Sequence, residues 1–289
     1  MANRYERILI FQETQRVINE TPFLADSTKN SILNQEIVWQ EDTVNYSLHR
    51  DLPAKVLLSH KRTLEAASFY SRKGYKVCVL NFASSVTPGG GVMKGASAQE
   101  ESLCRISTLY PAINDFSVSE FYSRHKQMIH TMTMGRENRD DCIYTSGVYV
   151  IREDTFDCEL LPPDQWYKVD VITCAAPDLR EDTRGFTYHP SEEELIAVHK
   201  KRFDRILSIA AKHEAEVVIL GAFGCGVFAN PPEIVVKAVN QVIGTFMHCF
   251  CTIEFAVFTS DIYSNNYQAF RHITGVEEKE IPIRFSQGE

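Results

Sequence analysis

The sequence predicts an α/β protein with three layers, in which helices cover both faces of one sheet. Short apolar runs alternate along the chain with longer helical patterns. These runs lack strict alternation of apolar and polar residues, as is typical of strands buried on both faces. No linker rich in Pro, Gly or Ser divides the 289 residues. We therefore expect a single domain over 1–289.

The N-terminal part predicts one helix and one short strand. Apolar residues recur at helical spacing over 5–19, which predicts a helix. A polar segment follows, and the apolar residues 37–39 predict a short strand. We expect residues 1–58 to form a mainly helical extension packed on the sheet domain. The charged segment 275–289 is expected to be a peripheral tail.

The central and C-terminal parts predict the sheet and its covering helices. Strands are expected where β-branched and apolar residues predominate, at 76–82, 142–152, 169–175, 217–220 and 252–258. Helices are expected at 59–72, 98–110, 117–134, 191–213 and 231–247. The fourth of these helices opens with Ser191 and three glutamates, an N-cap residue followed by acids that favour a first turn.

The composition argues against several classes of function. A net charge of −8 disfavours non-specific nucleic-acid binding, which needs a basic surface. The eight cysteines form no Cys-x-x-Cys pair or zinc-type cluster with histidine. No run of 18 apolar residues predicts a membrane span, and the first residues lack the apolar core of a signal peptide. We expect a cytoplasmic protein with reduced thiols.

The most informative segment combines a glycine-rich loop with a pair of acids. Gly89, Gly90 and Gly91 are followed, after a spacer of seven residues, by Gln99, Glu100 and Glu101. Consecutive glycines are useful where the backbone needs a positive φ or must approach another group closely. Loop and acids together predict a site that holds a ligand by its backbone and cleaves it with a carboxyl group.

A purely structural interpretation of the same acids is also open. Ser97-Ala98-Gln99-Glu100 has the pattern of a capping box, in which Glu100 would bond back to the Ser97 amide. Glu100 and Glu101 are successive helix residues, about 100° apart around the axis, and so would have different tasks. A carboxylate in a first helical turn is stabilised by the helix dipole, whereas a general acid needs a raised pKa. Burial, together with any negative charge on a bound ligand, would have to supply that rise.

A second glycine-rich block extends from 221 to 231 and includes Gly221, Gly224 and Gly226. It lies between a predicted strand and a helix that opens with two prolines, an arrangement that suits a diphosphate. An ordinary tight turn is the alternative, and the spacing is not that of a dinucleotide-binding Gly-x-Gly-x-x-Gly motif. Three further candidates for ligand contact are weaker: the strand end at 173–177, and Asp261 and Tyr263 after the last predicted strand.

The two blocks together resemble the poly(ADP-ribose) glycohydrolases, a branch of the macrodomain superfamily. The glycine triplet followed by Gln-Glu-Glu carries the resemblance, and the flanking Asn81-Phe82-Ala83 and Pro88 resemble the microbial-type branch. The resemblance extends over about residues 10 to 272. It implies a macrodomain-like mixed sheet in a three-layer α/β/α fold.

The resemblance also implies roles for individual residues. Glu101 would be the acid at the scissile bond, Glu100 would orient the ribose through its hydroxyls, and Phe228 would pack on the distal ribose. No metal or other cofactor is implied. Where the family usually has an Asn that binds the distal ribose, this chain has Ser84, whose hydroxyl is shorter and offers fewer donors. The implied substrate-binding residues are Ser84, Gly89, Gly90, Gly91, Gln99, Gly224, Cys225, Gly226, Val227 and Phe228.

The expected function is hydrolysis of the ribose–ribose O-glycosidic bond in poly(ADP-ribose), which releases ADP-ribose. The expected partners are ADP-ribose, its polymer or ADP-ribosylated proteins, with no membrane and no sequence-specific nucleic acid. Two alternatives remain open at this stage. One is a hydrolase of the same fold that acts on mono-ADP-ribosylated side chains, for example arginine-linked ones. The other is a macrodomain that only binds ADP-ribose, against which the paired acids argue.

Overall fold

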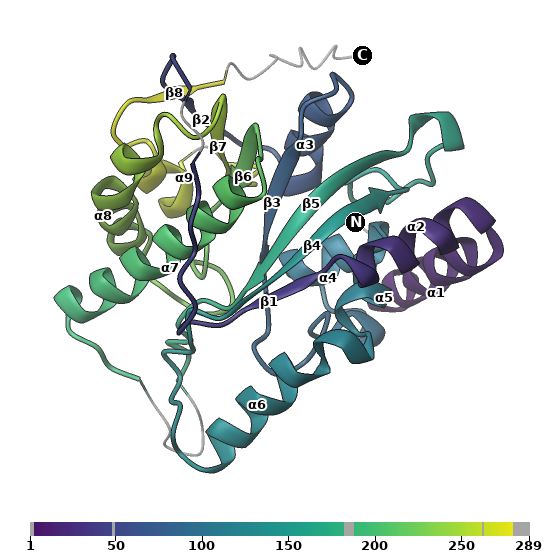
Figure 1. The fold of residues 1–289 in the computed structure, drawn as a ribbon, viewed down its shortest axis with the longest axis horizontal. Helices are drawn as coiled ribbons and strands as arrows, with labels where there is room; N and C mark the ends of the chain where they lie inside the picture. The colour runs from purple at the N-terminus through teal and green to yellow at the C-terminus, as the bar shows by residue number, and fades with distance from the viewer. Residues whose placement is uncertain (1–2, 48–49, 182–187, 262, 280–289) are drawn as a thin grey trace, which may run out of the picture.

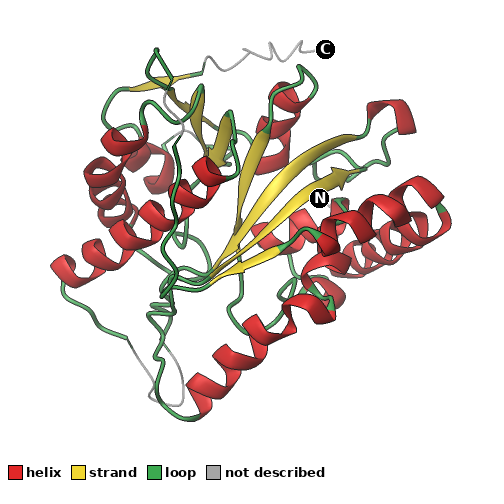
Figure 2. Ribbon diagram, viewed as in Figure 1, coloured by secondary structure: helices red, strands yellow, loops and turns green. Residues whose placement is uncertain are grey.

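A computed structural model describes residues 3–47, 50–181, 188–261 and 263–279 (Figure 1). The described residues form one eight-stranded mixed sheet at the centre of the molecule, with helices around it (Figure 2). The strands are β1 (Glu36–Val38), β2 (Lys55–Ser59), β3 (Val77–Phe82), β4 (Cys142–Val150), β5 (Tyr167–Cys174), β6 (Val217–Leu220), β7 (Thr252–Ala256) and β8 (Val276–Glu278).

The order of the strands is β1-β4-β5-β3-β6-β7-β2-β8. Only β4 runs against its neighbours, pairing antiparallel with both β1 and β5. The pairs from β5 through β3, β6, β7 and β2 to β8 are all parallel. The carboxyl ends of β5, β3, β6, β7 and β2 therefore meet along one edge of the sheet, where ligands bind in open α/β folds.

Helices cover both faces of this sheet. Figure 1 shows α7, α8 and α9 beside β6, β7 and β2, with α1 and α2 on the side of β4. The α-helices are α1 (Arg4–Glu20), α2 (Pro22–Leu33), α3 (Thr63–Ser71), α4 (Gln99–Ile106), α5 (Leu109–Ile113), α6 (Ser119–His130), α7 (Glu192–Lys212), α8 (Pro232–Val242) and α9 (Asn265–Phe270).

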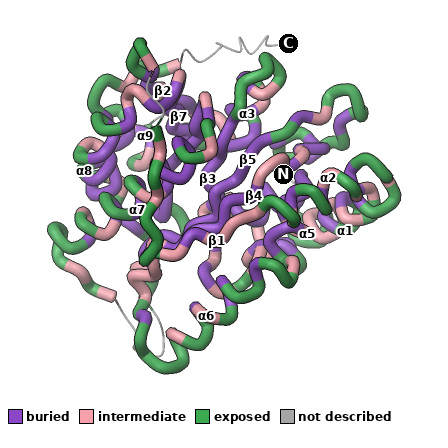
Figure 3. Tube along the Cα trace, viewed as in Figure 1, coloured by how far each residue is buried: buried purple, intermediate pink, exposed green. Residues whose placement is uncertain are grey.

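Alternate residues of β3 belong to two different hydrophobic clusters. Cys78 and Leu80 pack with α7 and α8, whereas Val77 and Val79 pack with α1, α3 and α4. All four side chains are buried, and Figure 3 shows the same burial along β3, β4 and β5. The predicted three-layer α/β fold with both sheet faces covered is therefore confirmed.

The predicted strands from 76 onward are confirmed, with end shifts of at most two residues. The helix expected at 98–110 is divided into α4 and α5, because Ser107 between them is extended and forms a β-bridge with Val150. The helix expected at 231–247 ends as α8 at Val242, and Ile243–Phe246 is a 3₁₀ helix. Ser191 is the N-cap of α7, as predicted, and it also forms a capping box with Glu194.

Two of the elements that were not predicted, α2 and β2, lie in the N-terminal segment, and α9 and β8 near the C-terminus were not predicted either. The expected helix 59–72 begins only at Thr63, because β2 occupies Lys55–Ser59 between β7 and β8. The polar segment after the first helix forms α2, whose buried residues are Leu24, Thr28 and Ser31. Thr28 and Ser31 bond to backbone carbonyls of their own helix, so polar residues fill positions where an apolar pattern would be sought.

The two ends of the chain both contribute to the sheet. The N-terminal segment contributes β1 and most of β2, and β8 of the expected tail pairs with β2 at the sheet edge. Glu254 in β7 accepts hydrogen bonds from Ser59 and Tyr70 and pairs with Lys279 just beyond β8. We propose that 1–289 is a single domain, because one sheet includes strands from both ends. Residues 280–289 of the expected tail lie outside the described part.

Candidate active site

A cavity of about 1370 Å³ lies at the edge of the sheet where the parallel strands end. It is lined by the segments after β2, β3, β5, β6 and β7 and by the first turn of α4. The two glycine-rich blocks of the sequence both contribute to its wall, although about 120 residues separate them. Gly90 of the first block and Gly224 and Gly226 of the second thus face a common space.

The glycine triplet approaches the acids so closely that a side chain would not fit. Gly89 and Gly90 have φ of +67° and +55°. A Cβ on Gly90 would lie 2.5 Å from Glu101 Oε1 and 3.0 Å from Glu100 Oε2. Both reasons for glycine therefore hold here, a left-handed backbone and a close approach. The two carboxylates converge on Gly90 even though the residues differ by about 100° around the helix axis.

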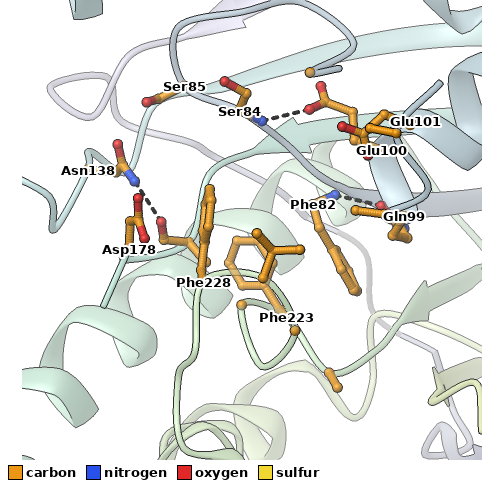
Figure 4. Close-up of a pocket in the computed structure, with 18 of the residues that line it drawn as sticks. Phe82, Ser84, Ser85, Gln99, Glu100, Glu101, Asn138, Asp178, Phe223 and Phe228 are labelled. Carbon is orange, nitrogen blue, oxygen red and sulfur yellow. Dashed lines mark hydrogen bonds between the residues drawn. The ribbon is translucent and has the colours of Figure 1, made fainter. Parts of the chain in front are cut away.

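The capping-box interpretation of the acids is wrong. Ala98, not Ser97, is the N-cap of α4, and it makes no side-chain capping bond. The Glu100 side chain turns instead toward the loop after β3, where its Oε2 accepts a hydrogen bond of 2.8 Å from the Ser84 backbone N–H. Figure 4 shows this contact, with Glu101 beside it.

Gln99 fixes the start of α4 to the end of β3. Its Oε1 accepts a bond of 2.9 Å from Phe82 N–H, and its Nε2 donates to the Leu80 carbonyl at 2.7 Å. Nε2 also donates to the Thr63 hydroxyl at 3.1 Å. Both ends of the Gln99 side-chain amide are therefore bound to other residues of the protein. These bonds suit a residue that positions the two glutamates next to it.

Glu100 is the more buried acid, with 3% of its surface exposed. Burial raises its pKa from 4.5 to about 8, and the neighbouring Glu101 adds to the rise, while the Ser84 N–H and Asn81 oppose it. The protonated form of Glu100 is therefore favoured in the ligand-free protein at neutral pH. The raised pKa was expected of the general acid, a role assigned to Glu101, and in the structure it is found on Glu100 instead.

Glu101 is also buried, at 8% exposure, and lines the cavity. Its Oε1 accepts a bond of 2.8 Å from Gly91 N–H. Its Oε2 is buried and has no hydrogen-bond partner among the described residues. A buried oxygen without a partner is costly, and such atoms are rare in native proteins. Glu101 thus keeps an unused hydrogen-bonding site in a residue that lines the cavity.

The raised pKa of Glu100 predicts a specific pH dependence of stability. Between pH 4.5 and about 8 the folded state retains a proton that the unfolded state has lost, so the free energy of unfolding falls as pH rises through this window. Glu100→Gln should flatten that fall. Urea denaturation at pH 5 and pH 8 measures it, and an equal fall in both proteins would contradict the assignment. Asp154, whose pKa burial raises to about 6, contributes in the same direction in both proteins.

The second glycine block forms a turn that Asn230 holds in place. The Asn230 amide is buried and donates to the carbonyls of Pro177, Gly224 and Phe228 at 2.7, 3.0 and 3.3 Å. Its Oδ1 contacts His199 Nε2 at 2.9 Å. The sequence analysis did not single out Asn230, although it is the only residue of the block with an amide side chain. Its role depends on contacts with distant segments.

Within this block, each site residue occupies a distinct environment. Gly224 has φ +78°, and a Cβ there would meet Ala176 and Asn230 at 2.7 Å. Gly226 lies in open space, with no atom within 4 Å of a Cβ. Phe228 is half-buried, Val227 is 57% exposed, and both line the cavity. Cys225 is half-buried, and burial raises the pKa of its thiol to about 12.

Ser84 and Ser85 line the cavity between the two blocks. The Ser84 hydroxyl accepts from Thr87 N–H at 3.1 Å, so it closes its own loop. Behind them, His125 contacts the Ser85 carbonyl through Nδ1 at 3.1 Å and Asp141 through Nε2 at 2.8 Å. His125 and Asp141 are buried, and they support the loop that carries the Ser84 N–H. This support is a second feature that sequence reasoning missed.

The weaker candidates have different outcomes. Ala176, after β5, lines the cavity and contacts the second glycine block. Asp261 and Tyr263 do not line it, and Tyr263 is 77% exposed.

Among the described residues, no group of three His, Cys, Asp or Glu side chains could hold a metal ion. None of the described helices is long and apolar enough to cross a membrane, and the eight cysteines form no disulfide.

Comparison with known proteins identifies the family. Residues 10–153 match the microbial-type PARG catalytic domain, where PARG denotes poly(ADP-ribose) glycohydrolase. The crystal structure of this enzyme from Thermomonospora curvata is 28% identical, with a TM-score of 0.80, over 92% of this chain and 98% of that one. The chain belongs to the microbial-type poly(ADP-ribose) glycohydrolases. It is a glycoside hydrolase of the poly(ADP-ribose) glycohydrolase type.

Two further glycohydrolase structures contain ligands. The Thermomonospora curvata enzyme bound to the inhibitor ADP-HPD is 28% identical, with a TM-score of 0.76 over 92% of this chain and 98% of that one. The Deinococcus radiodurans enzyme in complex with ADP-ribose is 26% identical, with a TM-score of 0.71 over 84% of this chain and 95% of that one. No curated protein sequence matches this chain.

Proposed function

We propose that this glycohydrolase cleaves the ribose–ribose bond of poly(ADP-ribose) with Glu101 as its general acid. The observation that carries the proposal is Glu101 Oε2, a buried carboxylate oxygen without a partner among the described residues. Gly91 N–H holds the other oxygen of the same group, so the carboxyl is oriented before substrate arrives. A pre-positioned acid of this kind contributes roughly 10²- to 10⁴-fold to a rate.

Glu100 is proposed to orient the ribose and to keep a proton in the acid pair. Because burial and the charge of Glu101 raise the pKa of Glu100 to about 8, the two carboxyl groups together carry a proton near neutral pH. In the reaction, Glu101 gives a proton to the leaving oxygen as the C–O bond breaks. Water then adds to the ribose carbon and returns a proton to the pair, which restores the starting state.

The remaining site residues are proposed to hold the terminal ADP-ribose unit. The turn at Gly224–Phe228, held by Asn230, would bind the diphosphate through backbone N–H groups, and Phe228 would pack on the distal ribose. Gly89, Gly90 and Gly91 would admit the ribose next to the acids. The relatives crystallised with ADP-ribose and ADP-HPD support a ligand of this kind.

Product analysis on three substrates tests the proposed linkage. Purified protein is incubated with poly(ADP-ribose), with arginine-linked and with serine-linked ADP-ribosyl protein, and released ADP-ribose is quantified. We expect release from the polymer at a rate well above that from either protein linkage. Preferential release from the arginine-linked substrate would favour a mono-ADP-ribosyl hydrolase instead.

Gly226→Val tests the proposed diphosphate site. A side chain there enters open space at the cavity wall, so the folded protein should keep its stability to within about 0.5 kcal/mol. ADP-ribose should raise the Tm of the wild type, AMP should raise it much less, and the variant should lose the ADP-ribose shift. Gly244→Val is the matched control, because Gly244 also has open space but lies outside the cavity. A full shift in Gly226→Val would place the diphosphate elsewhere.

A further inference from the structure

Three guanidinium groups bind the consecutive carbonyls of residues 94–96, in the loop between the glycine triplet and the acids. The bonds are from Arg4 Nε to Lys94 at 2.8 Å, from Arg7 Nε to Gly95 at 2.7 Å, and from a terminal nitrogen of Arg105 to Ala96. We refer to these three carbonyls as the carbonyl triplet. Hydrogen bonds from a charged donor are stronger than those between neutral groups, so the triplet is firmly held.

The three arginines come from two helices that pack against each other. Arg4 and Arg7 lie in the first two turns of α1, and Arg105 lies in the last turn of α4, where it is buried. Helix α1 also packs against the 3₁₀ helix Val92–Lys94, which follows the glycine triplet. The N-terminal helix of the chain is therefore in direct contact with the loop that leads to the acids.

At Gly95 the loop and α1 approach so closely that a side chain would not fit. Gly95 is buried and has a φ of +71°. A Cβ there would lie 2.3 Å from the Arg4 carbonyl oxygen and 3.1 Å from the Ile8 side chain. Both the left-handed backbone and the close approach require glycine. The first turns of α1 thus form one wall against which the loop is folded.

Two further hydrogen bonds connect the carbonyl triplet to Glu101. Ala96 N–H donates to the Gly91 carbonyl at 3.2 Å, and Gly91 N–H donates to Glu101 Oε1 at 2.8 Å. A Cβ on Gly91 would lie 2.9 Å from the Ala96 Cβ, so these two parts of the loop are also tightly packed. A shift of the carbonyl triplet would therefore move the N–H group that holds the Glu101 carboxyl.

We propose that Arg4 and Arg7 are positioning residues for Glu101. Together with Arg105 they hold the carbonyl triplet, and the loop in turn keeps Glu101 Oε1 in place. Neither Arg4 nor Arg7 lines the cavity, so both act through the loop and not on the ligand. This inference rests on the proposed function, because it assumes that Glu101 is the general acid. It makes the first turns of α1 part of the catalytic structure.

The double variant Arg4→Met/Arg7→Met tests the proposal by single-turnover hydrolysis of poly(ADP-ribose). Methionine keeps much of the apolar stem of arginine and removes both donors. The rate constant should fall roughly 5- to 50-fold, because a misplaced acid loses part of its contribution, whereas Kd for ADP-ribose should stay within about two-fold. Rates are measured well below the Tm of the variant, so that all of the protein is folded.

Two other variants show whether the hydrogen bonds carry the effect. Arg4→Gln/Arg7→Gln is also uncharged, but each glutamine has an amide N–H near the position of the arginine Nε. It should recover most of the lost rate. Arg16→Met is the matched control on α1, because Arg16 is 60% exposed and pairs with acids of its own helix. This control should hydrolyse the polymer at the wild-type rate.

A double-mutant cycle shows whether the two arginines act through Glu101. In Glu101→Gln protein, which should keep a slow residual rate, adding both Met substitutions should cause little further loss. The group that the arginines position is already gone in that protein, and residues that act as one unit are not additive.

Any of four results would overturn the proposal. They are a wild-type rate in the double Met variant, no recovery in the double Gln variant, an equal loss in Arg16→Met, and a full further loss in Glu101→Gln protein. Failure of the proposed function is distinguishable from all four. It would appear as full activity of Glu101→Gln alone, before any arginine is changed.

Discussion

Glu101→Gln should lower the rate of poly(ADP-ribose) hydrolysis by roughly 10²-fold or more while ADP-ribose binding stays within a few-fold. The amide keeps the shape of the carboxyl group and can still accept the hydrogen bond from Gly91 N–H. It has no proton to give to the leaving oxygen, so the transition state loses its acid while the ground state keeps its contacts. Single-turnover rates on polymer and calorimetry with ADP-ribose measure the two effects.

Glu100→Gln provides the comparison within the acid pair. It should also slow the reaction, because Glu100 is proposed to orient the ribose, but it leaves the proposed proton donor in place. The Ser84 N–H contact at 2.8 Å can be kept by an amide oxygen. A fully active Glu101→Gln protein beside an inactive Glu100→Gln protein would reverse the two assigned roles.

Gly90→Ala should abolish hydrolysis through the geometry of the acids. The added methyl group would lie 2.5 Å from Glu101 Oε1 and 3.0 Å from Glu100 Oε2, so both carboxylates must move. A displaced general acid loses most of its contribution, and we expect a rate at least about 10²-fold lower. The positive φ of +55° adds a backbone cost of about 1 kcal/mol in stability.

Gly275→Ala separates the backbone cost from the effect on the acids. Gly275 also has a positive φ, +73°, but no atom lies within 4 Å of a Cβ there. It should therefore lose similar stability and keep full activity. Thermal unfolding and polymer turnover of both variants are measured side by side. Comparable activity losses in the two proteins would mean that the Gly90 effect is one of stability alone.

Local patterns were sufficient for most of the fold. The continuous apolar run of β6, Val217–Leu220, reads as a buried strand from sequence and is one. The missed helix α2 lacks a clear apolar pattern: two of its three buried residues are Thr28 and Ser31, whose hydroxyls bond to nearby carbonyls. The short strand β2 was not predicted, and the helix predicted at 59–72 included its last residue, Ser59. Its extended conformation depends on pairing with β7 and β8.

The sequence by itself determined that a glycine triplet and two acids lie together, because they are close in the chain and carry a recognisable motif. Only the tertiary structure decided what the acids contact: Glu100 meets the Ser84 N–H instead of capping α4, and its pKa is raised because folding buries it. Asn230 likewise acquires its role from residues far away in the chain. Hydrogen bonds and burial of this kind depend on distances between segments, which local residue patterns do not encode.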